Sequence, residues 1–503
     1  MGKLFKAVAL VTLFSILTRA LGFVLRIYLS RILGAELLGS YQMAMSVFSV
    51  MLTLIASGLP TVIGRNVANL RSKNDFKTQN EYVSSGLILT LSISIICAII
   101  ITFFPNLLNF IFTSPKSTKI IILLMPALIS SAIYTILRGA LWGQKRFFSI
   151  SFAEFFEQGA RIIILFILMV IPLSLPADEK TAISLSLACI FSAIFVIIVY
   201  FAFGGRLGRT NKTMLPLIKK SSPITAVRTI SNLITSAISL IIPARLMLYG
   251  MSASEALSEY GIIMGMTFPL LMIPGTLIGS LSVAIIPEIS EQTTNIDVEV
   301  KSRETLKSQI NLSVGLAIVT SCLLLPMFLS VGKPIGEFLF NNEKAGIYLT
   351  YSAILMIPMG ISQITGSILN AIGLEIKSLK NSAISAALLF LAIYFLPKYF
   401  GVYALIIGMF LLTSTQSILN IKMLKKRNVI DHHVINILFS MLLLILPCVL
   451  LGIFTFNIAT KFLPLFFSIS LSAIISSGLL LILVFVTNIS NVKMFIFKRR
   501  KTL

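Results

Sequence analysis

Long apolar segments recur along the whole 503-residue chain. Inside a bilayer no water satisfies backbone N–H and C=O groups, so only helices and closed barrels span it. These segments are apolar all round and lack the alternation of barrel strands, which indicates helices. Because about 20 helical residues cross the hydrocarbon core, the sequence predicts an all-α polytopic membrane protein with fourteen spans. The predicted spans are 5–33, 39–64, 82–104, 119–142, 150–173, 181–203, 222–249, 257–286, 308–330, 346–370, 378–396, 402–421, 434–456 and 463–486.

The positive charges follow the predicted loops. The chain has 41 Lys and Arg residues against 18 Asp and Glu residues, which gives a net charge of +23. With the N-terminus in the cytoplasm, 27 basic residues fall in cytoplasmic segments, 9 in outer segments and 5 within spans. Cytoplasmic loops of membrane proteins carry such an excess. The distribution therefore predicts a multi-pass protein with cytoplasmic N- and C-termini, and it argues against a nucleic-acid partner.

A weak internal repeat divides the predicted spans. Gly39-Ser-Tyr41 opens the second span and Ser258-Glu-Tyr260 opens the eighth. Six spans in each repeat predict two lobes of the same orientation, and transporters of this kind bind substrate between their lobes and expose it to each side in turn. The predicted domains are an N-lobe over 1–203, a cytoplasmic inter-lobe linker over 204–221, a C-lobe over 222–421, and a segment over 422–503 with the last two spans and a basic tail.

Four arginines lie within or at the ends of the first and seventh predicted spans: Arg19, Arg26, Arg228 and Arg245. Arg19 and Arg26 are seven residues apart and so share one helix face. A charged side chain at the bilayer centre costs roughly 2.5–3.5 kcal/mol, so it is expected to face a cavity or a partner. Because arginine pairs bidentately with phosphate, we predict that these four residues bind a phosphate-bearing substrate. The alternative for Arg26 and Arg245 is snorkelling to the membrane surface.

A second group of charges lies around the connection between the fourth and fifth predicted spans. Glu157 and Arg161 have i,i+4 spacing with the acid first, which favours an ion pair. Arg138 is expected to meet Glu157 across the short connection. Together with Glu154, these residues predict a structural charge cluster, and a proton relay is the alternative. Glu288, at the cytoplasmic end of the eighth span, is interpreted as a helix-end or gate contact.

Residues suited to catalysis or metal binding are not grouped in the sequence. The two histidines, His432 and His433, are adjacent in a basic loop, and the four cysteines lie far apart in apolar spans. Neither set has zinc or disulfide spacing, and no phosphate-binding loop pattern occurs. We therefore predict no enzyme activity, no cofactor and no metal site. Transport would be driven by an ion gradient, the membrane potential or the substrate gradient.

Several motifs resemble one known family. They are Thr18-Arg-Ala-Leu-Gly-Phe23, Gly39-Ser-Tyr-Gln-Met-Ala44, Ala56-Ser-Gly-Leu-Pro60, Ile242-Pro-Ala-Arg245 and Ile286-Pro-Glu-Ile-Ser-Glu291. This set resembles the stage V sporulation protein B family of the multidrug/oligosaccharidyl-lipid/polysaccharide (MOP) exporter superfamily, related to MurJ-type lipid II flippases. The resemblance implies a MATE-like fold in the plasma membrane of a bacterium. It also implies a cationic cavity among spans 1, 2, 7 and 8, and a lipid-tail groove formed by spans 13 and 14.

The resemblance carries over to individual residues only in part. Arg19 matches the first essential arginine of the MurJ-type proteins, whereas their second aligns with Leu25 and their span 2 arginine falls near Thr53. Some relatives bind sodium with an aspartate near spans 7, 11 and 12. This sequence has no carboxylate there, and its nearest candidates are Asn232, Asn381 and Ser385.

The family resemblance implies a function in envelope synthesis. It implies a flippase that translocates an undecaprenyl-pyrophosphate-linked saccharide, such as a lipid II-like peptidoglycan or spore-cortex precursor, by alternating access. The implied partners are the lipid-linked glycan, membrane lipids and cell-wall synthesis enzymes. Three alternatives stay open. A drug or cation antiporter of the same fold would need carboxylates in the cavity, a non-transporting envelope or sporulation scaffold would function without Arg19, and a membrane glycosyltransferase would need an acidic or histidine cluster at a span end.

Overall fold

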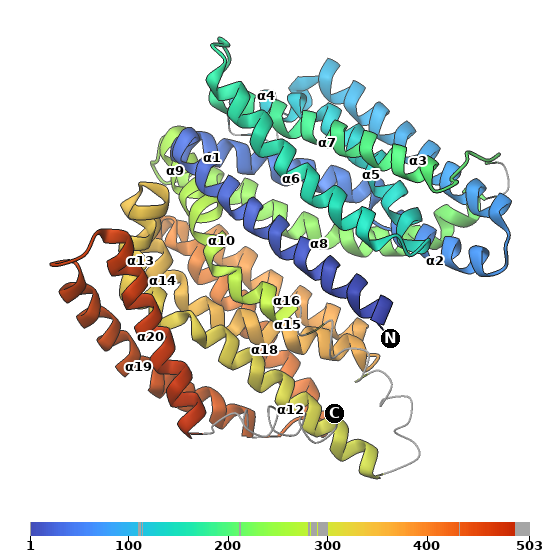
Figure 1. Cartoon of the computed structure of the whole chain (residues 1–503). Helices are drawn as coiled ribbons and strands as arrows, with labels where there is room; N and C mark the ends of the chain where they lie inside the picture. Colours follow the sequence, from blue (N-terminus) through green and yellow to red (C-terminus); the bar gives the residue numbers. More distant parts are fainter. Residues whose placement is uncertain are drawn as a thin grey trace. The chain divides into compact units, whose positions relative to one another are not determined.

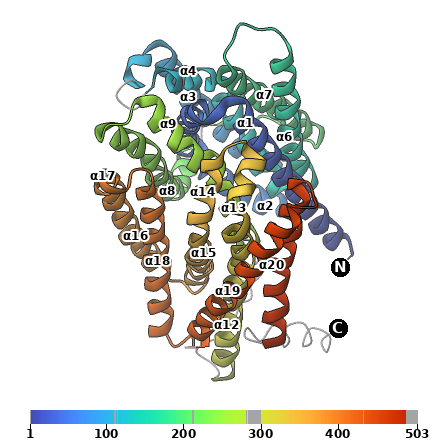
Figure 2. The same ribbon diagram turned by 90° about the vertical axis from the view of Figure 1, so that its left-hand side faces the viewer.

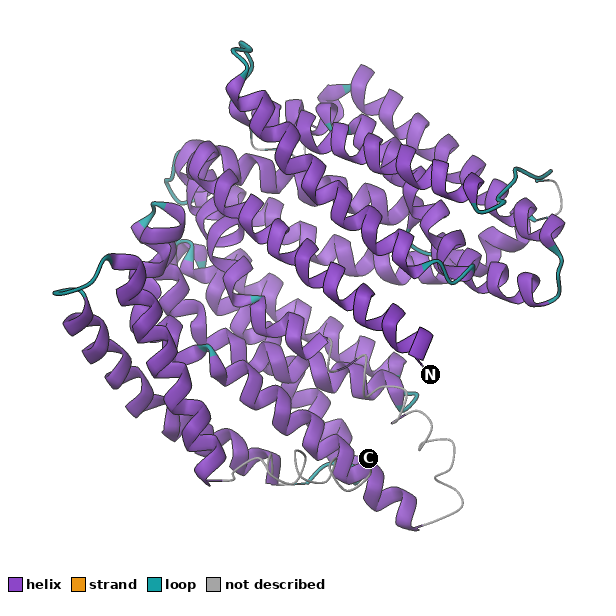
Figure 3. Cartoon of the chain, in the orientation of Figure 1, coloured by secondary structure: helices purple, strands orange, loops and turns teal. Residues whose placement is uncertain are grey.

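The computed structural model describes residues 2–108, 112, 114–210, 213–279, 282, 289, 300–431 and 433–487. Every regular element in these ranges is helical and none is a strand (Figure 3). The chain divides into two compact units, Met1–Gly261 and Ile262–Leu503. Glu288, predicted as a gate contact, lies outside the described residues, and so does the predicted basic tail beyond residue 487.

Unit 1 consists of nine labelled α-helices and one short 3-10 turn in its described part (Figure 1). The α-helices are α1 (Gly2–Ala56), α2 (Leu59–Ser72), α3 (Phe76–Phe103), α4 (Pro115–Leu123), α5 (Met125–Gly143), α6 (Phe147–Val170), α7 (Ala177–Ala202), α8 (Met214–Leu248) and α9 (Ala253–Gly261). The helix α8 packs on α1, α2 and α3. This packing brings the predicted seventh span into the same unit as the first six.

The long helix α1 contains a break at Gly34, whose φ of 66° is left-handed. Its 55 residues extend about 80 Å at 1.5 Å per residue, which is more than twice the roughly 30 Å hydrocarbon core. Glycine adopts a positive φ without the steric penalty of a Cβ atom. Gly34 therefore divides α1 between residues 33 and 39, where the sequence separates the first two predicted spans.

Unit 2 is also helical throughout its described part. Its elements are η2, a π-helix (Ile262–Thr267), α10 (Phe268–Leu271), α12 (Val300–Leu323), α13 (Leu325–Phe340), α14 (Glu343–Ser352), η3 (Ala353–Leu355), α15 (Met356–Ala371), α16 (Glu375–Phe395), α17 (Pro397–Phe400), α18 (Tyr403–Lys426), α19 (His433–Ala459) and α20 (Leu465–Thr487). The two C-terminal helices, α19 and α20, pack on each other and on α13 (Figure 2).

Ten described helical segments are long and apolar enough to cross a membrane, or twelve if each of two bent helix pairs is one span. Two features of the described helices explain why fewer than the predicted fourteen spans are counted. Residues Leu13–Ser72 count as one continuous segment, and α6 carries three charged residues in its central part. The predicted all-α, multi-pass architecture is confirmed, whereas the count of fourteen spans is not confirmed by these helices.

The compact units and the predicted lobes divide the chain at different places. Along the chain, unit 1 ends at Gly261 and unit 2 begins at Ile262, whereas the predicted linker covers residues 204–221. Within that linker, the helix α8 already begins at Met214. The lobe boundaries, which rest on the internal repeat, stay a prediction.

Candidate functional site

A row of polar contacts joins the second half of α1 to α8 in unit 1. The two helices run antiparallel, because a later residue of α1 contacts an earlier residue of α8. The hydroxyl of Ser46 is 2.7 Å from that of Ser239, and the hydroxyl of Ser236 donates to the Ser46 main-chain oxygen at 3.0 Å. Nearer the end of α1, the Asn232 amide donates to the hydroxyl of Thr53. In apolar surroundings such polar pairs hold helices together.

The break between α1 and α2 is fixed by α8. The Gly58 N–H donates to the Thr225 hydroxyl at 3.1 Å. Arg228 donates to the main-chain oxygen of Ser57 and, at 3.4 Å, to the hydroxyl of Thr61. A Cβ atom at Gly58 would lie 2.4 Å from the Thr225 hydroxyl oxygen, so only glycine allows this approach. One predicted substrate-binding arginine thus also has a structural contact.

A basic pocket of about 650 Å³ lies between α2 and α5, with Arg228 of α8 at its edge. The two helices approach closely, because a Cβ atom at Gly139 would lie 2.7 Å from the Pro60 main chain. Four basic side chains and one tryptophan contribute to the wall, and no carboxylate does. The lining residues are Pro60, Thr61, Gly64, Arg65, Ala68, Thr135, Arg138, Gly139, Trp142, Gly143, Lys145, Phe147 and Arg228.

The charge of the basic pocket is only partly neutralised. Arg138 forms an ion pair with Glu154 of α6 at 2.5 Å. Arg65 and Lys145 are exposed and make no ion pair within the part of the chain that the structure describes. The pocket therefore carries a net positive charge and suits an anionic group.

The predicted charge cluster separates into two contacts along α6. Arg138 meets Glu154, not Glu157 as its expected partner. Arg161 makes no ion pair with Glu157 among the described residues and instead donates to the Tyr41 hydroxyl at 2.6 Å, although Glu157 interacts with it electrostatically. Residues 154 and 161 are seven positions apart, which is about 10 Å along a helix. This distance explains why α5 reaches one of them and α1 reaches the other.

Arg26 belongs to the second of these contacts. It interacts electrostatically with Arg161 and with Tyr41. Arg26 makes no hydrogen bond or ion pair of its own among the described residues, so two guanidinium groups lie near one neutral hydroxyl. Tyr41 is 3% exposed whereas Arg26 is exposed, so this cluster extends from the interior of unit 1 to its accessible surface. The sequence grouped Arg26 with Arg19 and assigned Arg161 to a structural cluster, whereas the structure brings Arg26 and Arg161 together.

The remaining two predicted arginines lie apart from the basic pocket. Arg19 is exposed on α1 and has no hydrogen bond or ion pair within the described ranges. Arg245 donates to the hydroxyl of Tyr249, one turn later in the chain, and its guanidinium lies 5.1 Å from the Tyr249 ring centre. Arg228 and Arg245 are 17 positions apart, which is about 26 Å along α8. The four arginines are therefore distributed along two helices, and one headgroup cannot contact all of them at once.

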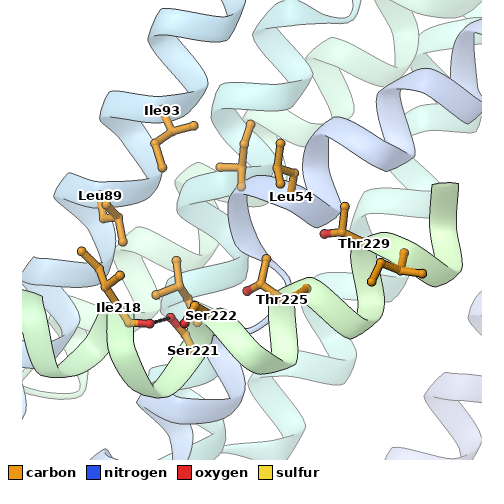
Figure 4. Close-up of a pocket in the computed structure, with 12 residues that line it drawn as sticks. Leu54, Leu89, Ile93, Ile218, Ser221, Ser222, Thr225 and Thr229 are labelled. Carbon is orange, nitrogen blue, oxygen red and sulfur yellow. Dashed lines mark hydrogen bonds between the residues drawn. The ribbon is translucent and has the colours of Figure 1, made fainter. Parts of the chain in front are cut away.

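An apolar cavity of about 390 Å³ lies between α1, α3 and α8 (Figure 4). Leu54, Leu89 and Ile218 project toward it from the three helices. The only polar groups in its wall are hydroxyls, including those of Thr225 and Thr229. Because no lining residue is charged, this cavity suits hydrocarbon.

The residues considered for sodium lie in different units. Asn232 is in the α1–α8 contact of unit 1. In unit 2, the Asn381 amide donates to the Asn420 side-chain oxygen at 3.0 Å, and the Asn420 amide donates to the Thr365 hydroxyl at 3.2 Å. The hydroxyl of Ser385 donates to the Asn381 main-chain oxygen. Asn381 and Ser385 thus belong to a buried network that connects α15, α16 and α18.

Sequence reasoning did not single out three residues of the basic pocket. In the sequence, Arg65 and Lys145 have the ordinary explanation of basic residues in cytoplasmic segments, and no motif points to Trp142. A usable signal was present in Gly139-Ala-Leu-Trp-Gly143, because small residues four apart let membrane helices approach closely. That spacing identifies the face of α5 that meets α2 and forms the pocket.

Many long apolar helices, with the basic pocket among helices of unit 1, define a multi-pass helical membrane protein. The chain belongs to the polysaccharide biosynthesis protein family, whose family model matches residues 4–293. It is 23% identical over 382 residues to stage V sporulation protein B of Bacillus subtilis (strain 168), and the match covers 73% of each chain. The family predicted from the sequence motifs is thus confirmed.

Two solved structures share this fold. Lipid II flippase MurJ, in an inward closed conformation, matches with a TM-score of 0.69 and 15% identity, covering 94% of this chain and 97% of that chain. A multidrug resistance MATE family transporter of the MOP superfamily, in an inward-facing conformation, matches with a TM-score of 0.60 and 16% identity, covering 83% and 94%. These matches confirm the predicted MATE-like fold class.

Proposed function

We propose that this protein is a flippase for an undecaprenyl-pyrophosphate-linked saccharide, such as a lipid II-like peptidoglycan or spore-cortex precursor. It would act in the cytoplasmic membrane by alternating access, with both termini in the cytoplasm. The observation that carries the proposal is the basic pocket between α2 and α5. The family and the fold of a lipid II flippase support the same class of substrate.

The pocket has the chemistry that a pyrophosphate-linked sugar requires. Arg65, Lys145 and Arg228 supply positive charge for the pyrophosphate, and arginine binds phosphate oxygens bidentately. Trp142 is 54% exposed beside them, and its ring offers a flat apolar face to the sugar. On the predicted topology, Arg65 and Lys145 lie at the cytoplasmic side, where a newly made lipid-linked precursor is available.

The arginines outside this pocket suit later steps of the same movement. Arg19 and Arg26 lie on the first half of α1, and Arg245 lies about 26 Å along α8 from Arg228. A headgroup that moves through the membrane needs successive positive contacts to offset the cost of leaving water. Arg19, Arg26, Arg228 and Arg245 would supply these contacts in sequence, and α19 with α20 would accommodate the prenyl tail.

The antiporter alternative is less well supported by the pocket. A drug or cation antiporter needs carboxylates that bind a cation or a proton in its cavity. The basic pocket is lined by four basic residues and by no Asp or Glu. Glu154, which is not part of the lining, is already paired with Arg138.

The proposal is tested with purified protein in liposomes that contain a fluorescent undecaprenyl-pyrophosphate-linked glycan. Translocation is read from the fraction of label that becomes accessible to a membrane-impermeant quencher. The variants Arg19→Gln and Lys145→Gln should each slow translocation at least about tenfold, the loss expected for one charge-assisted contact. Lys73→Gln, an exposed cation outside the basic pocket, is the matched control and should keep the wild-type rate. Equal rates in all four proteins would contradict the proposal.

A further inference from the structure

A third cavity of unit 1 lies at the ends of four helices. It has a volume of about 590 Å³ and shares no residue with the basic pocket. Its wall combines the end of α2, the start of α3, the end of α5 and the chain that follows α7. The lining residues are Arg71, Phe76, Lys77, Gln79, Asn80, Gln144, Phe203, Gly204, Arg206, Leu207 and Gly208. We call it the glutamine pocket, after Gln79 and Gln144.

The chain after α7 is held in place as one wall of the glutamine pocket. Gly204 turns the chain with a φ of 80°. The fully buried Tyr200 donates from its hydroxyl to the Arg206 main-chain oxygen at 3.4 Å. The Gly208 N–H donates to the Ser84 hydroxyl of α3 at 2.8 Å. This wall belongs to the segment predicted as a linker, and its start is fixed on α3.

The side-chain oxygens of two buried glutamines in the glutamine pocket lack a partner among the described residues. Gln79 is 3% exposed and Gln144 is 6% exposed, and both line the cavity. The side-chain oxygen of each receives no hydrogen bond from any described residue. Leaving a buried acceptor unsatisfied costs about 1–3 kcal/mol, and native proteins satisfy nearly all such groups. Two such acceptors in one wall call for a ligand with hydrogen-bond donors, such as hydroxyl groups.

The same cavity is positively charged. Arg71, Lys77 and Arg206 line it, and none of them forms an ion pair among the residues described here. Asp75, which interacts electrostatically with Lys77, is not part of the lining and accepts a hydrogen bond from the Thr78 N–H as the N-cap of α3. Three cations without a paired carboxylate favour an anion.

The mouth of the glutamine pocket has the composition of a membrane surface. Phe76 is 49% exposed and Leu207 is 65% exposed beside the three cations. The Arg146 guanidinium lies 3.9 Å from the centre of the Phe203 ring. Aromatic and basic side chains concentrate where a membrane meets water. This location favours a ligand that is part of the lipid layer.

We propose that the glutamine pocket binds a phosphate ester that carries free hydroxyl groups, the chemistry of a phosphatidylglycerol headgroup. Arg71, Lys77 and Arg206 bind the phosphate, and the oxygens of Gln79 and Gln144 accept hydrogen bonds from the hydroxyls. The bound headgroup connects α3 and α5 to the chain that leads into α8. This inference does not depend on the glycan that the protein carries.

The test uses the full chain in nanodiscs of phosphatidylcholine with increasing fractions of phosphatidylglycerol or phosphatidic acid. Bound lipid is counted by native mass spectrometry, and the melting temperature is recorded in parallel. Phosphatidylglycerol should bind more tightly than phosphatidic acid, which has no hydroxyl-bearing headgroup, and should raise the melting temperature. Glycerol 3-phosphate added to phosphatidylcholine nanodiscs tests a soluble ligand of the same chemistry. If glycerol 3-phosphate bound as tightly as phosphatidylglycerol, the assignment of the ligand to a lipid would be overturned.

Matched variants distinguish a specific binding site from nonspecific attraction of anionic lipid to basic residues. Arg206→Gln should weaken phosphatidylglycerol binding at least about tenfold, whereas Arg209→Gln, an exposed cation outside the lining, should change it less than about twofold. Gln144→Met should abolish the preference for phosphatidylglycerol over phosphatidic acid and leave phosphatidic acid binding unchanged. Equal weakening by Arg206→Gln and Arg209→Gln, or an unchanged preference in Gln144→Met, would overturn the proposal.

Discussion

Arg228 donates a hydrogen bond to the main-chain oxygen of Ser57, the residue that follows the end of α1 and precedes α2. A carbonyl at a helix end lacks an intrahelical partner, and the guanidinium supplies one. Arg228 also lines the basic pocket. The same side chain therefore holds the α1–α2 break and presents charge to the proposed substrate.

Replacing Arg228 by alanine should destabilise unit 1. The Ser57 oxygen loses a charged donor, and a hydrogen bond to a charged group contributes about 1.5–3 kcal/mol. Thermal unfolding in nanodiscs measures this loss as a lower melting temperature. Arg65→Ala removes a cation of the same pocket that has no partner among the described residues, so its melting temperature should stay close to that of the wild type. Equal melting temperatures for Arg228→Ala and wild type would rule out the structural role.

Gly58→Ala should also destabilise the α1–α2 break. The new Cβ atom would lie 2.4 Å from the Ser221 main-chain oxygen and the Thr225 hydroxyl oxygen, so α8 must move away. Overpacking of this kind costs about 1–3 kcal/mol. Gly159→Ala in α6 is the control, because no atom lies within 4 Å of its Cβ position. Melting curves should show a loss only for Gly58→Ala, and equal behaviour of the two variants would contradict the predicted clash.

The helical architecture could be predicted because the apolar segments and the loop charges point to the same spans. The break at Gly34 lies between the first two predicted spans, and the family motifs are confirmed by the match over residues 4–293. The packing of α8 on α1 and α2 could not be predicted in this way. It depends on the close approach at Gly58 and on hydroxyl pairs such as Ser46 with Ser239, which hydropathy does not record.

The residue types of the candidate site could be predicted from the sequence, but which of these residues lie close together could not. A deep arginine signals an internal surface, yet helix periodicity does not say which neighbouring helix faces it. Arg161 therefore contacts Tyr41 of α1, and Arg138 pairs with Glu154, one turn before the expected Glu157. The sequence does not mark Arg65 as a site residue, because basic residues are common at the cytoplasmic ends of membrane spans.

The ion pair between Arg138 and Glu154 predicts a specific energetic coupling. In a double-mutant cycle with Arg138→Ala and Glu154→Ala, the coupling free energy should be about 0.5–1 kcal/mol. The value is modest because the two side chains are 41% and 32% exposed. The same cycle with Glu157→Ala is the control and should give a smaller coupling, because Glu157 interacts with Arg138 electrostatically without forming an ion pair among the described residues. A larger coupling for the control pair would support the pairing expected from sequence spacing and contradict the observed one.

The hydrogen bond from Arg161 to Tyr41 predicts that Tyr41→Phe lowers stability. The substitution keeps the ring, which is 3% exposed, and removes only the acceptor at 2.6 Å. The Arg161 Nε atom is already buried without a partner among the described residues, so the guanidinium would lose a contact that no neighbour replaces. Such a loss costs about 1–3 kcal/mol and should lower the melting temperature in nanodiscs. Tyr28→Phe, whose hydroxyl makes no hydrogen bond in the described chain, should melt like the wild type. A wild-type melting temperature for Tyr41→Phe would show that Arg161 is held by other contacts.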